Sequence, residues 1–157
     1  MRRLVLICCL VVAPLTASAD GLRAYCARVG DDDTIRSYDP ALRSELATAF
    51  QRLFPGGLPP DRRTLRVQTH LRCMGGYVLA CFTGANLPCA KLNTAQTNPG
   101  ADNYCRSNPE ADNVPAFATG HDTAFSFRCH AGKAQVSGKT FPLDSRGFAA
   151  SLWTPID

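Results

Sequence analysis

The stretch that decides the fold is residues 64–89, TLRVQTHLRCMGGYVLACFTGANLPC, in which two apolar runs flank the pair Gly75-Gly76. Two glycines between apolar runs are typical of a β-hairpin turn, because glycine readily adopts the positive φ that tight hairpin turns require. The second run, residues 77–82, is apolar throughout, as expected for a strand buried on both faces. The sequence therefore predicts a β-hairpin at the centre of a sheet.

The first arm of this hairpin, residues 67–73, alternates apolar with polar side chains. The polar ones belong to Gln68, His70 and Arg72. Strict alternation predicts a strand with one buried face and one solvated face. We therefore expect these three side chains to point into solvent.

The N-terminus has the features of a secretory signal peptide. A pair of arginines precedes the apolar run at residues 4–15, and small residues that suit a cleavage site follow it. The run is too short to span a bilayer comfortably. We therefore expect a signal peptide at residues 1–19 and a single periplasmic or secreted domain at residues 20–157, with no stable membrane insertion after cleavage.

Cysteine usage supports export. Two of the eight cysteines lie in the leader. The remaining even number predicts three disulfides, because an exported chain folds in an oxidising compartment; the six are Cys26, Cys73, Cys81, Cys89, Cys105 and Cys129.

Hairpin geometry restricts how these cysteines pair. Cys73 and Cys81 lie on opposite arms but out of register, about 10 Å apart at the usual strand rise, whereas a disulfide spans at most about 7 Å between Cα atoms. No bond is expected between them. Cys89 and Cys105 bracket a polar loop and are the preferred pair, and the other pairings stay open.

Charge and motifs exclude several classes of function. Removal of the leader's two arginines lowers the net charge from +4 to +2, too little to indicate binding to nucleic acid. The chain has no serine-hydrolase elbow, zinc-protease helix or phosphate-binding glycine loop. Three aspartates at residues 31–33 lack the alternate spacing of a calcium loop and are interpreted as a solvated acidic turn. We expect no metal and no cofactor.

The clearest helix signal begins at Asp39-Pro40, because aspartate is a good N-cap and proline suits the first helical position. Apolar residues then recur at helical spacing as far as residue 53, and Pro55-Gly56-Gly57 ends the pattern. Residues 59–63 are predicted to form a stiff linker between this helix and the hairpin.

The second half of the chain predicts a loop, a short helix and further strands. Residues 84–100 form a long polar loop, and Asn98-Pro99 can begin a short helix after it. Strands are expected at residues 123–129, 133–137 and 148–153, and the short apolar run at residues 114–118 is a further candidate. The segment FRCHAG at residues 127–132 is a weaker echo of LRCMGG in the central hairpin.

One strong helix followed by six candidate strands indicates an α+β fold. We expect an N-terminal amphipathic helix packed on a small antiparallel, hairpin-built β-sheet that disulfides staple together.

Five segments of the chain resemble a group of small secreted cysteine-containing proteins of proteobacteria. They are residues 25–30, 72–76, 84–89, 115–122 and 144–148. The resemblance implies a bacterial periplasmic or secreted setting and no particular activity. In size and β content the chain is also similar to periplasmic lysozyme inhibitors, although it shares no motif with them.

These observations lead to two hypotheses. The first is a secreted or periplasmic, non-enzymatic binding or accessory protein, such as an inhibitor, with a periplasmic or extracellular protein as partner. Its candidate binding residues are Arg72, Asn86, Asn93, His121 and Trp153, although Trp153 can equally close the core. The alternative is a small exported hydrolase that uses the neighbouring pair His121 and Asp122 for acid–base catalysis.

Overall fold

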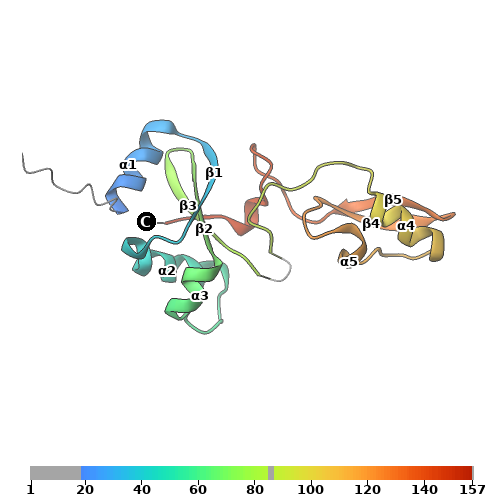
Figure 1. The fold of residues 1–157 in the computed structure, drawn as a ribbon, viewed down its shortest axis with the longest axis horizontal. Helices are drawn as coiled ribbons and strands as arrows, with labels where there is room; N and C mark the ends of the chain where they lie inside the picture. The colour runs from blue at the N-terminus through green and yellow to red at the C-terminus, as the bar shows by residue number, and fades with distance from the viewer. Residues whose placement is uncertain (1–18, 85–86, 157) are drawn as a thin grey trace, which may run out of the picture.

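Two antiparallel sheets, each with its own helices, organise the chain in the computed structural model, which describes residues 19–84 and 87–156 (Figure 1). A four-stranded sheet has the order β1-β2-β3-β6, and a separate two-stranded sheet pairs β4 with β5. Helices with antiparallel sheets confirm the predicted α+β class. The predicted signal peptide lies outside the described residues except for its last position.

We call the two halves the sheet lobe and the hairpin lobe. The sheet lobe consists of α1 (Ala19–Val29), β1 (Asp32–Ser37), η1 (Pro40–Leu42), α2 (Arg43–Leu53), α3 (Arg62–Gln68), β2 (Thr69–Met74), β3 (Tyr77–Phe82) and β6 (Thr154–Pro155). The hairpin lobe consists of α4 (Pro99–Ser107), α5 (Ala116–Thr119), β4 (Phe125–His130) and β5 (Lys133–Lys139). Figure 1 shows them at opposite ends, joined by extended segments.

The central hairpin forms as predicted. Cys73 lies opposite Val78 in the β2–β3 ladder. Gly75 and Gly76 form the turn with φ of 60° and 83°, a left-handed conformation that glycine adopts without steric cost. β3 pairs with β2 on one side and with β6 on the other, so it is central in the sheet.

The arm before the hairpin differs from the prediction. Residues 62–68 form α3 instead of linker and strand, because the Asp61 side chain accepts a hydrogen bond of 2.6 Å from the Thr64 amide and caps the helix. Only Leu65 of this helix is buried, and Val67 is 70% exposed. The alternating pattern therefore belongs to a strand only from Thr69 onward.

The strong helix signal is confirmed by η1 followed by α2. Asp39 caps this helix, since its side chain accepts a hydrogen bond of 2.9 Å from the Ala41 amide. Leu42 and Leu46 are fully buried in the main core, against the sheet and Cys26. α2 therefore packs against β3 and β6, as the prediction of a helix on a sheet requires.

Two predictions about strands were wrong. Asp32 and Asp33 begin β1, which pairs with β2, and Asp31 bonds the hairpin turn, so residues 31–33 do not form a free turn. Residues 148–153 form a short 3-10 helix, η2 (Ala150–Leu152), because the chain here turns around the buried Phe148 before β6.

The hairpin lobe begins at a capped helix, as predicted. The Asn98 side chain accepts a hydrogen bond of 3.0 Å from the Ala101 amide at the start of α4. Gly100 lets α5 approach α4 closely, because a Cβ here would lie 2.0 Å from the Ala118 carbonyl oxygen. The predicted strands at residues 123–129 and 133–137 correspond to β4 and β5.

All six cysteines of the expected mature chain form disulfides, with the pairs Cys26–Cys73, Cys81–Cys89 and Cys105–Cys129. The absence of a Cys73–Cys81 bond was predicted correctly. The preferred Cys89–Cys105 pair was wrong, because Cys89 is buried beside Cys81, whereas Cys105 belongs to the core of the other lobe. The bonds indicate an oxidising environment.

The echo between residues 71–76 and 127–132 is a repeated structural unit. In each case a helix cysteine bonds to a hairpin cysteine, α1 to β2 and α4 to β4. The hairpin turn is then fixed by two hydrogen bonds from its amides. In the first unit Gly75 and Gly76 donate to the Asp31 carboxylate and the Gly30 carbonyl.

The second unit repeats these contacts at the same offsets from its helix cysteine. Ala131 and Gly132 donate to the Glu110 carboxylate, at 2.8 Å, and to the Pro109 carbonyl, at 3.1 Å. We call this arrangement the helix–hairpin unit. The described part of the chain contains it twice, once in each lobe.

None of the helices described is both long and apolar enough to cross a bilayer.

The hairpin lobe should depend on its disulfide, because a two-stranded sheet is only marginally stable alone. We expect Cys105→Ala with Cys129→Ala to remove about 3.5 kcal/mol in the chain-entropy model. Hydrogen exchange followed by mass spectrometry should then show lost protection in α4, β4 and β5, with β2 and β3 still protected.

The matched control is Cys81→Ala with Cys89→Ala, whose bond closes a much shorter segment. This variant should leave the hairpin lobe protected. Equal loss of protection in both lobes after removal of Cys105–Cys129 would contradict the independent stability of the sheet lobe.

Candidate functional site

The structure divides the predicted binding residues between two places. Arg72 and Trp153 meet in the sheet lobe, where the Arg72 guanidinium carbon lies 4.6 Å from the centre of the Trp153 ring. Asn93 and His121 lie near each other at the hairpin lobe, since the Asn93 amide donates to the Asp122 carbonyl. Asn86 lies outside the described residues.

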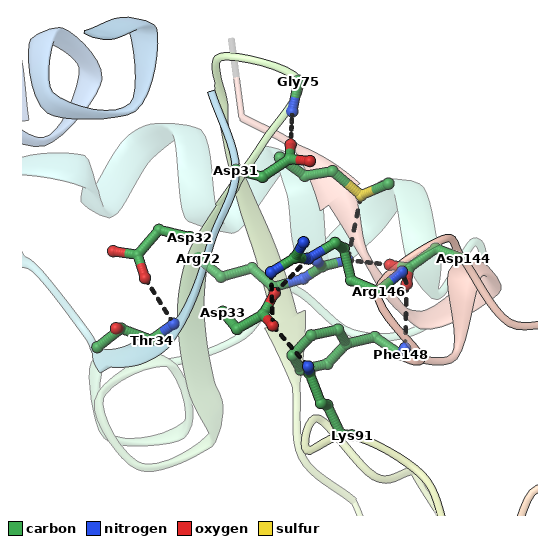
Figure 2. Close-up of polar contacts among 11 residues, drawn as sticks. Asp31, Asp32, Asp33, Thr34, Arg72, Gly75, Lys91, Asp144, Arg146 and Phe148 are labelled. Carbon is green, nitrogen blue, oxygen red and sulfur yellow. Dashed lines mark hydrogen bonds and ion pairs between the residues drawn. The ribbon is translucent and has the colours of Figure 1, made fainter. Parts of the chain in front are cut away.

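The first group is buried, contrary to the prediction that Arg72 faces solvent. Arg72 is 1% exposed, and its guanidinium contacts the rings of both Phe148 and Trp153, which pack edge to face with each other. Its Nη2 donates to the Asp144 carboxylate, as Figure 2 shows. The alternating pattern failed here because distant residues cover the second face of β2.

Asp144 holds this cluster through the turn that follows it. Its other carboxylate oxygen accepts hydrogen bonds from the amides of Arg146 and Phe148, at 2.8 and 3.0 Å (Figure 2). These bonds fix Phe148 over the Arg72 guanidinium, with 4.1 Å between the guanidinium carbon and the ring centre. Cation–π contacts of this kind are strongest where water is excluded.

An outer layer of charges covers the same cluster. Asp33 of β1 accepts hydrogen bonds from Arg146 at 2.8 and 2.9 Å and pairs with Lys91 at 2.5 Å (Figure 2). The hydrogen bonds from Arg146 and Lys91 lower the pKa of Asp33 to about 2. The neighbouring Asp32 also has a pKa held well below its usual range, chiefly by Arg36.

These contacts give Arg72 and Trp153 a structural role. Both side chains are buried, so neither presents a polar group on the surface for a partner. The acidic stretch at residues 31–33 is likewise engaged with protein groups, through Gly75, Thr34 and Arg146. Throughout residues 19–84 and 87–156, no group of three or more His, Cys, Asp or Glu side chains is placed to hold a metal ion.

The second group lies beside a pocket of about 270 Å³ at the edge of β4 and α5. His121 lines this pocket together with Phe125 and Phe141, and several side chains with amide or hydroxyl groups complete it: Asn113, Thr119, Thr123, Ser126 and Thr140. Asp122 is not among the lining residues.

His70 is half-buried in β2, although the sequence places it on a solvated face. Burial lowers its pKa below the usual value, so the imidazole is neutral at physiological pH.

Sequence reasoning missed an open groove of about 730 Å³ between η1, α2 and α3. We call it the arginine groove. Its lining residues are Ser37, Tyr38, Pro40, Arg43, Arg62 and Arg66. The only available signal was the spacing of Arg62 and Arg66, which become neighbours on one face once α3 is known to be helical.

The three arginines of the groove are not neutralised by the protein. All are exposed, and no ion pair or hydrogen bond joins their side chains to another described residue. By contrast, Arg23, Arg36, Arg72 and Arg146 each contact a carboxylate. The arginine groove is therefore a positively charged hollow with unused hydrogen-bond donors.

The surface beside the groove is hollowed along α2 as well. A second hollow of about 430 Å³ shares Pro40 and Arg43 with the arginine groove. A third of about 180 Å³ shares Ser44 with the second and reaches Arg52. Neighbouring hollows along the exposed side of α2 therefore share lining residues.

Breaking the buried ion pair should strongly destabilise the fold. We expect Arg72→Ala to lower the free energy of unfolding by about 3–5 kcal/mol, because it leaves the Asp144 carboxylate buried without its partner. Denaturant titration measures this change. Arg128→Ala is the matched control, because Arg128 occupies the same position in the second hairpin and is exposed. It should cost less than about 0.5 kcal/mol, and equal losses would contradict the assignment.

Asp33 should make stability depend on pH in the acid range. Its pKa is lowered in the folded protein, so its contribution is full above the unfolded pKa of about 3.9 and is lost as the pH falls toward about 2. Asp33→Asn should therefore show a smaller drop in unfolding midpoint between about pH 5 and pH 2 than the parent protein. Asp112→Asn, which changes an exposed carboxylate, should keep the parent slope; an unchanged slope in Asp33→Asn would refute the role of this ion pair.

Comparison with known proteins adds no assignment to this geometry. No protein-family model matches the chain, and no curated protein or solved structure matches it.

Proposed function

We propose that this chain is a non-enzymatic binding protein of the periplasm or the extracellular space, and that its arginine groove binds an acidic segment of a protein partner. The observation that carries the proposal is the convergence of Arg43, Arg62 and Arg66 on one hollow without any carboxylate to neutralise them. Elsewhere in the sheet lobe, Arg23 and Arg36 each pair with a carboxylate.

The chemistry of the groove favours an anionic ligand. Guanidinium groups bind carboxylates through two parallel hydrogen bonds, which gives both strength and orientation. Arg62 and Arg66 are one helical turn apart on α3, and Arg43 comes from the first position of α2, so the three groups approach a ligand from two sides. Tyr38 and Ser37 add an aromatic edge and a hydroxyl.

The shape of the surface favours an extended ligand over a single small anion. The hollows along α2 are open and share residues, so a chain bound in the arginine groove can continue past Arg43 toward Arg52. A volume of about 730 Å³ lies within the range usual for ligand sites. An acidic peptide segment meets both conditions, since it supplies repeated carboxylates on an extended backbone.

The test uses a fluorescently labelled hexaglutamate peptide as the probe. Fluorescence anisotropy at low salt should show saturable binding, which weakens as salt rises because the contacts are electrostatic. The triple variant Arg43→Gln, Arg62→Gln, Arg66→Gln should bind at least about tenfold more weakly, since each lost charge-assisted contact at a solvated site contributes up to about 1 kcal/mol.

The matched control removes three exposed arginines that do not line the groove, Arg63, Arg106 and Arg128, and therefore has the same net charge. It should retain parent affinity. If it loses as much affinity as the groove variant, net charge alone explains binding. If inorganic phosphate competes as well as an equal concentration of peptide carboxylates, the groove takes single anions and the extended-ligand proposal fails.

A further inference from the structure

We propose that the pocket beside His121 is a second binding site, for a small, uncharged, hydroxyl-rich ligand such as a single sugar ring. The site belongs to the hairpin lobe, whereas the arginine groove belongs to the sheet lobe at the opposite end of the molecule (Figure 1). It is therefore independent of the anionic partner proposed above.

The pocket contains polar side chains whose hydrogen-bonding groups the protein does not use. Asn113, His121, Ser126 and Thr140 line it, and their side chains form no hydrogen bond with another part of the described chain. Together they present an amide, an imidazole and two hydroxyls, which can both donate and accept. A ligand rich in hydroxyls has the same dual character and can pair with all four.

Apolar surface lies next to these groups. Phe125 and Phe141 line the pocket and are both partly exposed. The C–H face of a sugar ring packs well against an aromatic ring, while the hydroxyls at its edge remain free to meet polar side chains. Small-molecule sites usually combine aromatic side chains with a few polar groups that orient the ligand.

The charge and size of the pocket restrict the class of ligand that fits it. None of its lining residues is Asp, Glu, Lys or Arg, so His121 is the one ionisable group among the residues that line it. An anionic or cationic ligand would find no fixed counter-charge there. The volume of about 270 Å³ is below the usual range for drug-sized ligands. The pocket therefore suits one small neutral ring.

The His121 turn is held in place from both sides, which reduces the cost of binding. Gly120 has φ of 85° and ψ of 161°, a conformation that is essentially restricted to glycine, and a Cβ there would lie 2.9 Å from the Asp122 carboxylate. The Asn98 side chain donates to the Thr119 carbonyl at 2.8 Å. After the turn, the Asp122 carbonyl accepts from Asn93.

The repeated architecture places both sites in equivalent segments. In each helix–hairpin unit, a connecting segment joins the carboxylate residue that binds the hairpin turn, Asp31 or Glu110, to the first strand of the hairpin. The connecting segment after Asp31 contains every lining residue of the arginine groove. The connecting segment after Glu110 contains His121 and most of the other residues that line its pocket. The two connecting segments differ in sequence, whereas the disulfide and the turn hydrogen bonds are the same in both units, as expected if each segment binds a separate ligand.

The experiment is a two-dimensional ¹H–¹⁵N NMR titration of the full oxidised chain with glucose and N-acetylglucosamine, each to about 50 mM, because single small ligands bind in the millimolar range. Saturable shift changes should concentrate at residues 113–126 and 140–141. Glucuronate, which adds a carboxylate, should bind no more tightly than glucose. The residues of the arginine groove should not shift with either neutral sugar.

Two variants and one control test the assignment. Asn113→Ala and Ser126→Ala should each weaken binding about fivefold, the effect of one ordinary hydrogen bond, without lowering the melting temperature. Ser137→Ala, on β5 but outside the pocket, should bind as the parent does. The proposal is overturned if neither neutral sugar gives saturable shifts, or if the shifts persist unchanged in both pocket variants. Loss of hexaglutamate binding would not bear on it.

Discussion

The buried ion pair between Arg72 and Asp144 is the contact on which the sheet lobe depends. It joins the central hairpin to a turn 72 residues later and fixes Phe148 against the guanidinium, which also contacts the neighbouring Trp153 ring. Taking both charges out of water is costly, and an apolar replacement is often no less stable. What the pair provides is a defined position for the end of the chain, so that β6 can add to β3.

The same region joins the two lobes. The segment that leaves β3 carries Lys91, and the segment that returns from the hairpin lobe carries Arg146; both meet Asp33 of β1. Beneath them Leu92 packs with Ala149 in a small cluster of its own. The arginine groove and the His121 pocket therefore lie on opposite sides of one joint, and both connections through it are fixed by ion pairs to β1.

What could be predicted from the sequence was local. Asp39 and Asn98 cap helices through their own nearby amides, and the Gly75-Gly76 turn follows from the φ that glycine permits. Burial of Arg72 could not be predicted, because the groups that cover it come from far along the chain. The disulfide partners of Cys26 and Cys129 depend in the same way on how helices dock on hairpins. The arginine groove was hidden because α3 was interpreted as linker and strand.

Comparison of the two helix–hairpin units shows which features are set by neighbouring residues and which by residues far along the chain. Arg72 and Arg128 each precede a disulfide-bonded cysteine at the same position in a two-residue hairpin. In both hairpins a turn amide donates to a carboxylate, from Asp31 in the first and Glu110 in the second, yet Arg72 is buried and Arg128 is exposed. Local sequence therefore determines the turn and the cross-link, whereas burial of the arginine requires Phe148 and Trp153, which lie over only the first hairpin. A shared scaffold with different surroundings leaves each unit free to carry a different binding surface.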